Sequence, residues 1–396
     1  MFTKLNECHS DSFLIKHLLP PTMNKKQLRD INFFIHRYLG LIVALILVIV
    51  GLTGSILVFQ REIDHFLVHR QVGNIVPSRE RVPVEVVLNK IKSAYSSQPD
   101  IKVESIDIPK LANDPYQVWF SRNDKWTEVF IHPYTAAILG TREWEKTILG
   151  VTFQLHYQLL AGETGTIIVG IAALFLLILS ITGFILWPGW LKLVAGFKIK
   201  LKAHIKRLNF DIHKVVGIIS VVFLAMIAFT GFCWNFNGFT YPVIYAVTRT
   251  PKPPELVSQV VAGKQSISVT QAMQIADAAL NGAATTYISI PTKPEGVFRV
   301  NKKFPQEKED FGRSRVYIDQ YTGQVLRIRD ERNLPLGEKV LDSFTPMHYG
   351  TFGGLTTRIF YVFIGLAPLI LSVTGLIMWW YRPKKSNLIP NRKFMT

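Results

Sequence analysis

Four histidines stand at duplicated distances from downstream Thr-Gly pairs. Two of them, His36 and His213, are followed by a glycine after 4 residues and by a Thr-Gly pair after 17 residues. The other two, His156 and His348, are each followed by a tyrosine and, after 26 residues, by a Thr-Gly pair. The two patterns alternate along the chain, which indicates an internal duplication. We therefore expect the four imidazoles to occupy equivalent places in two repeated halves.

The residues around these histidines limit the chemistry that is open to them. The adjoining apolar segments contain no Asp or Glu, and the chain has two cysteines, Cys8 and Cys233. A cysteine-based zinc or iron–sulfur site and a carboxylate di-metal site therefore lack their ligands. The absence of a C-x-x-C-H motif excludes a covalently attached haem. Pairs of neutral imidazoles from neighbouring helices suit axial ligation of b-type haem, so two pairs predict two haems.

Simpler interpretations compete with this one. A single histidine in a membrane span is often a hydrogen-bonded packing residue, but four histidines at duplicated spacings favour ligation. The Thr-Gly pairs are interpreted as backbone-bonding kinks or close-packing sites. Arg37 and Lys214 directly follow two of the histidines. Their side chains can pair with haem propionates, or they can serve only as basic anchors at a membrane surface.

Composition places the elements that must hold these residues in a membrane. The 396-residue chain is 48% hydrophobic and only 18% charged, with a mean hydropathy of +0.22, which is typical of an integral membrane protein with soluble parts. Its net charge of +17 is concentrated in residues 1–37, 188–214 and 382–396, which hold 18 Lys/Arg and 4 Asp/Glu. All three segments flank apolar runs, so we place them, and both termini, in the cytoplasm. The lipid bilayer is the expected partner of this charge, and without a nucleic-acid-binding motif no nucleic acid is expected.

Topology then sorts the histidines into two faces. Four apolar segments, roughly 33–59, 165–187, 215–237 and 358–381, are long enough to cross a hydrocarbon core of about 30 Å. Because the first and third run outward, His36 and His213 form an inner pair. His156 and His348 precede spans that run inward, so they form an outer pair. A helix places a histidine about 25 Å from a threonine 17 residues later, so the two pairs must be well separated.

Two regions outside the spans, 61–147 and 239–345, share one plan. Each begins with an amphipathic helix, predicted at 82–95 and 268–280, and continues with several short strands. The segments VFIHPYTAAIL and VYIDQYTGQVL match position for position. We expect two small α+β modules on the outer side of the membrane.

The predicted fold class is therefore an α-helical integral membrane protein with four main transmembrane helices as an internal duplication, plus two small α+β modules. The expected parts, in chain order, are a cytoplasmic N-terminal segment (1–32), transmembrane helix 1 (33–60), the first module (61–147), an interfacial segment with transmembrane helix 2 (148–190), a cytoplasmic basic loop (191–212), transmembrane helix 3 (213–238), the second module (239–345), an interfacial segment with transmembrane helix 4 (346–381) and a cytoplasmic tail (382–396). Gly162, Glu163 and Gly165 are expected to break the helix before the second span.

Three further titratable residues lie on the outer side. His65 and His69 are four residues apart, a spacing at which two histidines on a helix can bind a metal. The sequence shows no third ligand near them, so a solvated helix face is favoured. Glu163 can act as a proton or substrate group near the outer pair, although helix capping is the favoured role.

Several motifs together resemble a known family. They are HRYLGLIVALILVIVGLTG, LHYQLLAGETG, DIHKVVGIISVVFLAMIAFTG, and MHYGTFGGL followed by LSVTGLIMWW. The chain resembles the PepSY-associated transmembrane helix proteins from about residue 30 to 382, and its modules resemble PepSY domains. The resemblance implies haem ligation by the four histidines. It also implies an oxidoreductase of the bacterial inner membrane, because members of the family include ferric-siderophore reductases that bind haem b.

The expected function is thus transfer of electrons across the membrane to a ferric siderophore in the periplasm, with release of Fe(II). No dinucleotide-binding G-x-G-x-x-G motif follows a predicted strand, so the electron donor is a quinol or a separate reductase. Two other functions stay open. One is a permease component for siderophore or iron, for which four spans are few. The other is a membrane protein whose modules regulate a periplasmic protease, which leaves the four histidines unexplained.

Overall fold

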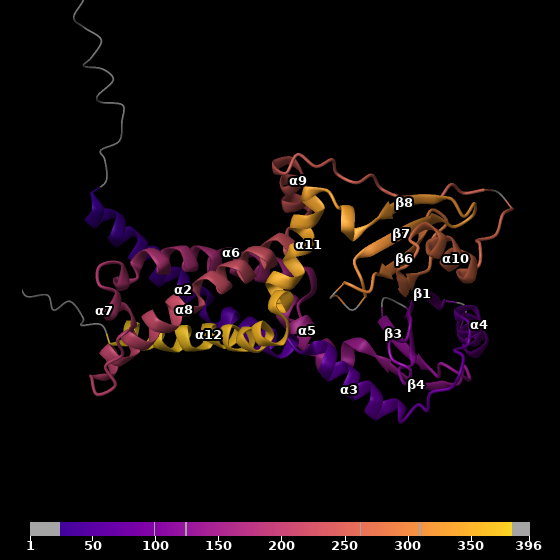
Figure 1. Cartoon of the computed structure of the whole chain (residues 1–396). Helices are drawn as coiled ribbons and strands as arrows, with labels where there is room; N and C mark the ends of the chain where they lie inside the picture. The colour runs from indigo at the N-terminus through magenta and orange to yellow at the C-terminus, as the bar shows by residue number, and fades with distance from the viewer. Residues whose placement is uncertain are drawn as a thin grey trace, which may run out of the picture. The chain divides into compact units, whose positions relative to one another are not determined.

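A computed structural model describes residues 24–381, except 99, 123, 124, 262, 308 and 310. The predicted cytoplasmic tail (382–396), most of the N-terminal segment and Cys8 lie outside the described residues. Figure 1 labels the helices and strands along the chain. The chain divides into two compact units. The described part of the first unit comprises 24–48, 172–229 and 367–381, and the second comprises 49–171 and 230–366. Each unit contains one of the two histidine pairs.

Four long apolar helices contribute residues to both units. They are α2 (Lys25–Leu57), α6 (Gly162–Leu186), α8 (Ile205–Asn235) and α12 (Gly354–Trp380). Each has a stretch that is long and apolar enough to cross a membrane. The prediction of four spans is therefore confirmed, and the chain is a multi-pass membrane protein. Helices α2 and α8 begin well before the predicted apolar limits, because their helical backbone continues through charged residues.

Short helices precede the second and fourth spans of the chain. Helix α5 (Ile148–Gln158) and helix α11 (Leu336–Tyr349) carry His156 and His348 in their last turns. The break predicted at 162–165 lies slightly earlier, where Leu159 and Leu160 adopt left-handed φ angles of 51° and 57°. Gly165 is needed for a different reason. A Cβ atom there would lie 1.6 Å from the carbonyl oxygen of Gln158, so only glycine lets α6 pass the end of α5.

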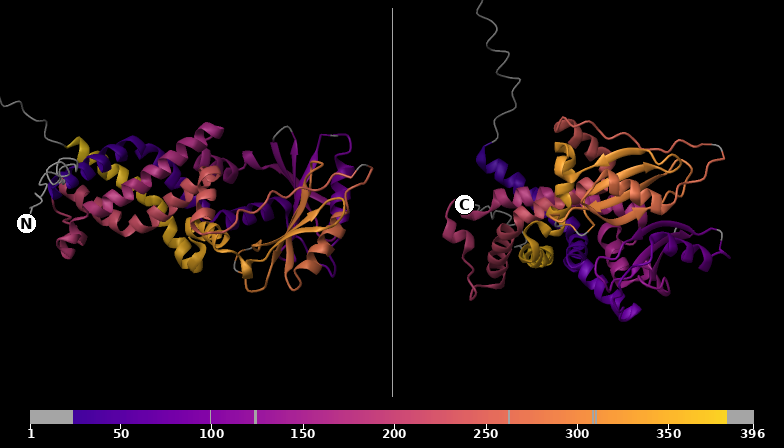
Figure 2. Two further views of the ribbon diagram at one scale, coloured as in Figure 1. Left: turned by 90° about the horizontal axis from the view of Figure 1, so that it is seen from above. Right: turned by 45° about the vertical axis from the view of Figure 1, so that its right-hand side comes forward.

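The strands of the two predicted modules form one sheet within the second unit (Figure 2). The first half contains β1 (Lys102–Asp107), β2 (Tyr116–Arg122), β3 (Lys125–Ile131) and β4 (Ile138–Glu143). The second half contains β5 (Ala284–Ser289), β6 (Val297–Lys303), β7 (Ser314–Asp319) and β8 (Val325–Arg329). The order is β4-β3-β2-β1-β5-β6-β7-β8, and every pair is antiparallel.

The two halves join through strands β1 and β5, with Ile106 opposite Ile288. This pairing satisfies two strand edges that separate modules would leave open. The amphipathic helices α4 (Val84–Ala94) and α10 (Val269–Ala279) are confirmed, and their apolar faces share one core with the sheet. Further helices are α3 (Gln60–Val72), α7 (Leu193–Phe197) and α9 (Asn237–Val247). The predicted repeat of helix and strands is thus confirmed, but the two repeats form one layered domain instead of two separate modules.

A buried charge cluster ties α3 to the first half of this sheet. Arg142 on β4 donates to the Oε2 atom of Glu128 at 2.7 Å and lies 2.8 Å from Asp64 Oδ1 on α3. Glu128 is fully buried. Burial raises the pKa of Glu128 from 4.5 to about 7, although Arg142 acts in the opposite direction. Burial also raises the pKa of Asp107 to about 6.

The raised pKa of Glu128 predicts that the sheet domain is more stable in mild acid. A carboxyl group that holds its proton more tightly in the folded state stabilises the fold below its unfolded pKa, and this contribution is lost as the pH rises through about 7. For Glu128 the loss is about 3 kcal/mol. We expect Glu128→Gln to reduce the decline in unfolding free energy between pH 5 and pH 8, measured by urea unfolding with tryptophan fluorescence. Part of the decline should stay, because burial also raises the pKa of Asp107 to about 6 and that of Glu331 to about 7. Glu80→Gln, at an exposed position, is the control, and an unchanged pH profile in Glu128→Gln would contradict the expectation.

Candidate cofactor-binding site

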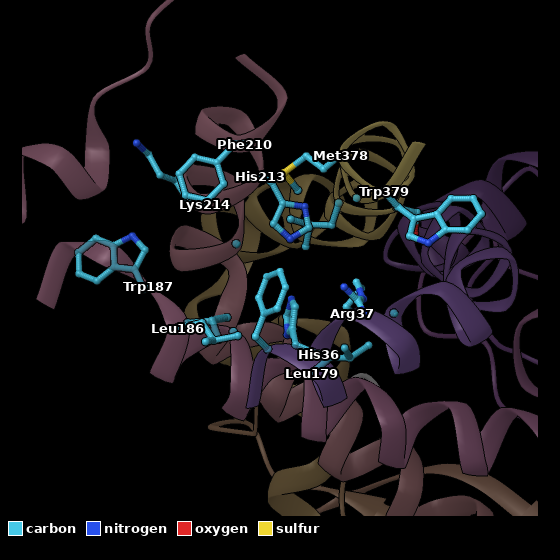
Figure 3. Close-up of a pocket in the computed structure, with 18 of the residues that line it drawn as sticks. His36, Arg37, Leu179, Leu186, Trp187, Phe210, His213, Lys214, Met378 and Trp379 are labelled. Atoms are coloured by element: carbon cyan, nitrogen blue, oxygen red, sulfur yellow. The ribbon is translucent and has the colours of Figure 1, made fainter. Parts of the chain in front are cut away.

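The first histidine pair lies in the first unit, with His36 on α2 and His213 on α8. The two imidazole rings have centroids 6.1 Å apart and planes at 85°. Figure 3 shows both rings within one pocket, approached from different helices. Each histidine projects from the middle of a continuous helix, which extends beyond it on both sides. The path of that helix therefore determines where the ring enters the pocket.

A threonine from a third or fourth helix holds each ring of this pair. The Nδ1 atom of His36 is 2.9 Å from Thr182 Oγ1 on α6, and that of His213 is 2.9 Å from Thr374 Oγ1 on α12. Each threonine hydroxyl also donates to the carbonyl four residues earlier in its own helix, at 2.8 Å for Thr182 and 2.7 Å for Thr374. With its proton used there, the hydroxyl oxygen accepts from the imidazole, so Nδ1 carries the hydrogen. The Nε2 lone pair is then the one that can ligate a metal.

The second pair repeats this arrangement in the second unit. His156 on α5 and His348 on α11 have ring centroids 6.1 Å apart and planes at 81°. His348 Nδ1 is 2.8 Å from Thr230 Oγ1, and His156 Nδ1 is 3.2 Å from Thr53 Oγ1. His156 Nδ1 also lies 2.9 Å from the Val50 carbonyl oxygen. Because a carbonyl can only accept, this contact places the proton on Nδ1 of His156.

The ring separation in both pairs matches two imidazoles on opposite sides of one metal. A metal–imidazole nitrogen bond is about 2.0 Å, and the ring centroid lies roughly 1.2 Å beyond the nitrogen. Two such ligands on opposite sides of one metal have centroids about 6.4 Å apart, against 6.1 Å in each pair. The separation of the rings is therefore compatible with a metal held between them.

In two of the Thr-Gly pairs the glycine gives the neighbouring imidazole its space. A Cβ atom at Gly183 would lie 3.0 Å from His36 Cε1, and one at Gly54 would lie 3.0 Å from His156 Cε1. At Gly375 the distance to His213 Cε1 is 3.7 Å. The Thr-Gly pair is thus a receptor for the imidazole of another helix. The sequence alone indicates only a kink or packing site, and the repeated spacing between histidines and Thr-Gly pairs was the available signal of this role.

The first pair opens into a cavity of about 1040 Å³ within the first unit (Figure 3). This volume is at the upper end of the range for ligand pockets, which is about 300–1,000 Å³. Most of the lining is apolar. Basic side chains also line it, namely Arg29, Arg37, Lys206, Arg207 and Lys214. An amphiphilic ligand with an apolar ring and anionic groups matches this combination.

The two basic residues predicted to contact propionates differ in their contacts. Lys214 donates to Asp211 Oδ1 at 2.6 Å and to the Ala195 carbonyl at 2.8 Å, so its charge is already paired. Arg37 stacks over the ring of Tyr38 at 4.3 Å. Its buried Nε atom has no hydrogen-bond partner within the described part of the chain. An anionic group in the cavity would supply the acceptor that Arg37 lacks, so Arg37 fits the predicted role better.

The other titratable residues considered from the sequence, and two aromatic residues near His348, lie in the second unit. Glu163 is in the first turn of α6, the position expected for a residue that interacts with a helix start. Tyr349 belongs to a ring cluster in which Trp234 lies 4.7 Å from His348 between centroids. Trp234 was not identified from the sequence. His65 and His69 lie on α3, away from both histidine pairs in sequence and fold element.

The chain matches the PepSY-associated TM region family over residues 33–382. Among solved structures it is similar to a lipoprotein from Clostridium difficile 630, with 12% identity, 65% of this chain and 99% of that chain covered, and a TM-score of 0.26. A TM-score this low supports no inference about fold or function. No curated protein matches the chain. The family match covers all four long helices, both histidine pairs and the sheet.

Proposed function

The chain belongs to the PepSY-associated TM region family, and on this premise we propose that it is a two-haem b electron-transfer protein that reduces ferric siderophores. Its four histidines would be the axial ligands of the two haems, with His36 and His213 on one and His156 and His348 on the other. Electrons would pass from the cytoplasmic side of a bacterial inner membrane to a ferric complex in the periplasm. The reaction is one-electron reduction of Fe(III) to Fe(II) in the siderophore complex.

One observation carries the proposal. In both pairs the Nδ1 atoms are bonded to threonine hydroxyls of neighbouring helices, while the ring centroids lie 6.1 Å apart. A histidine that only packs in a membrane needs one such bond and no partner ring at a metal-ligand distance. The same geometry occurs in both pairs, which are built from different helices. This repetition favours metal ligation over a packing role for the four histidines.

Haem, when bound, would supply one-electron redox chemistry, and ligation of its iron by two histidines would favour electron transfer over oxygen binding. The residues of the chain hold the imidazoles in one tautomer and orientation, leave room for the rings at Gly54 and Gly183, and place Arg37 beside the cavity. Acid–base catalysis is not required of any residue in this scheme.

Reduction alone is sufficient to release the iron. A siderophore binds Fe(III) through hard oxygen ligands, and Fe(II) is a softer ion that such ligands hold less tightly. The chelator therefore need not be broken. Because the sequence has no dinucleotide-binding motif, the electrons come from a quinol in the bilayer or from a separate reductase.

Reconstituted vesicles test this function. The protein is inserted into liposomes with a reduced quinol in the bilayer, and a ferric siderophore is added outside together with an Fe(II)-specific chelating dye. We expect dye–Fe(II) to form in vesicles that contain the protein and to stay at background in empty vesicles. Equal rates in both, with the quinol and also with dithionite enclosed in the vesicles as the donor, would contradict the proposed function.

The threonines provide a more specific prediction. Thr374→Val keeps the shape of the side chain but removes the acceptor for His213 Nδ1. Loss of a group that orients a metal ligand commonly costs about 10–100-fold in affinity, so we expect haem to bind the first pair that much more weakly. Thr374→Ser keeps the hydroxyl and is the matched control. Haem titration of the apoprotein distinguishes the two, and equal affinity in the valine variant and the wild type would show that the bond does not orient a ligand.

A further inference from the structure

A third group of ligand-type side chains lies in the second unit, apart from both histidine pairs. His65 and His69 are on consecutive turns of α3, with ring centroids 4.3 Å apart. Asp114, in the loop between β1 and β2, lies 3.1 Å through its Oδ1 atom from Nε2 of each histidine. One ligand atom of each of the three residues lies within 4.8 Å of the other two. The structure thus brings to the two histidines the third ligand that sequence analysis did not identify.

The loop that carries Asp114 is held in place by other residues. Asp114 Oδ2 accepts from the Leu111 backbone N–H at 2.9 Å. Arg81 donates to the carbonyl oxygens of Pro109 and Leu111 at 2.7 Å and 2.8 Å. Tyr134 donates to the Ala112 carbonyl at 2.8 Å. These contacts fix the carboxylate opposite α3 and leave Oδ1 directed at the two imidazoles, which is the support that a preformed metal site requires.

The spacing of the ligand atoms suits a transition-metal ion. Two ligand atoms about 2.1 Å from one ion, at angles between the octahedral and tetrahedral values, lie about 3.0–3.4 Å apart. The two histidine–aspartate distances are both 3.1 Å. A small outward movement of the side chains would admit the ion, which would replace the hydrogen now shared between each Nε2 and the carboxylate. The His65 side chain is 52% exposed, so the remaining coordination positions face solvent.

We propose that His65, His69 and Asp114 bind one divalent transition-metal ion. Two imidazoles and one carboxylate with open positions are the ligand set that proteins use for Fe(II). We further infer that the ion bound in use is the Fe(II) released from the siderophore, and this choice of ion rests on the proposed function. The three-residue site would then receive the product before it is passed on, with water or the departing chelator in its open positions.

Cobalt binding tests the site directly. The probe is Co(II), which takes similar ligands and does not oxidise in air, and the protein is the full chain in detergent, without a histidine tag and after treatment with a chelator. Equilibrium dialysis followed by cobalt analysis should find one Co(II) per chain. Loss of an indirect, orienting residue costs about 10–100-fold in metal affinity, so removal of a direct ligand in His65→Ala or Asp114→Asn should weaken binding by at least about 100-fold.

A matched control is available in the same unit. His132 accepts through Nδ1 from the Tyr134 backbone N–H, and His132→Asn keeps that acceptor while removing an imidazole. This variant should bind Co(II) like the wild type. No bound cobalt in the wild type, or equal binding in His65→Ala, Asp114→Asn and the wild type, would overturn the proposal.

Cobalt dialysis uses neither electron donor nor ferric substrate, so the two proposals fail separately. A protein that binds Co(II) through these residues but reduces no ferric siderophore refutes the proposed function and retains the three-residue site. A protein that reduces ferric siderophore but binds no cobalt refutes the site alone.

Discussion

Replacement of His156 by alanine should remove one haem and bring ferric-siderophore reduction to background. The haem content should fall from about two to about one per chain, because alanine offers no axial ligand to the second pair. His348 alone would then be left to ligate the iron of the second pair. Electrons that reach the first pair would then have no cofactor at the second pair from which to reach the substrate.

Loss of a ligand from the first pair should give a different spectral result. His36→Ala should also leave about one haem, but with the spectral properties of the second pair, and reduction driven by the quinol should again be lost. Haem content is measured by the pyridine haemochrome method, and reduction by the vesicle assay with the Fe(II)-specific dye. His132→Asn, which changes a histidine outside both pairs, should keep both haems and full activity. Unchanged haem content and activity in His156→Ala would refute ligation by that residue.

Replacement of Arg329 by methionine should unfold or loosen the helix that carries His348. Arg329 on β8 donates to Glu338 Oε2 at 2.9 Å and to Asp342 Oδ2 at 2.6 Å, both on α11. Glu338 and Arg329 are 6% and 7% exposed. Arg327 also donates to Glu338 Oε1, at 2.6 Å, so the substitution leaves Asp342 as the carboxylate without an arginine. Loss of one partner from a buried ion pair costs about 3–5 kcal/mol, and we expect the lower end here because the Asp342 side chain is 20% exposed. Because α11 ends with His348 in its last turn, the second pair should lose its haem as well.

A neighbouring arginine gives the control for this change. Arg332 pairs with Asp330 within its own turn, and its side chain is 50% exposed. Exposed pairs of this kind contribute little to stability, so Arg332→Met should leave both the unfolding transition and the haem content near those of the wild type. The measurements are urea unfolding followed by tryptophan fluorescence, and the haem count. An Arg329→Met variant with wild-type stability and two haems would show that the contact between β8 and α11 does not position the site.

The sequence was sufficient for the parts of this molecule that depend on local patterns. Uncharged apolar runs identify the four long helices, and alternating or helical periodicity identifies α4, α10 and most strands. The duplicated spacing of His36 and His213, and of His156 and His348, selects the four imidazoles that the structure brings together in pairs. The repeat in the two modules is also visible, since it lies in residue identities.

Contacts between distant segments could not be predicted in the same way. Thr182 and His36 are 146 residues apart, and Thr374 and His213 are 161 apart, so nothing local connects the hydroxyl with the ring. Asp114 joins His65 only because the loop after β1 passes α3. The pairing of β1 with β5 depends on two strand edges that a linear reading treats separately. In each case the contact depends on which surfaces meet in the folded chain. The periodicity of the sequence does not contain this information.

The most direct test of the account is the absorption spectrum of the detergent-purified protein, oxidised and dithionite-reduced, combined with a pyridine haemochrome count. The geometry of the two histidine pairs predicts two b-type haems per chain with the sharp bands of six-coordinate, low-spin iron. Well-folded protein from haem-replete cells that contains no haem would contradict the central claim, and a permease component or a regulator of a periplasmic protease would then be the functions to test.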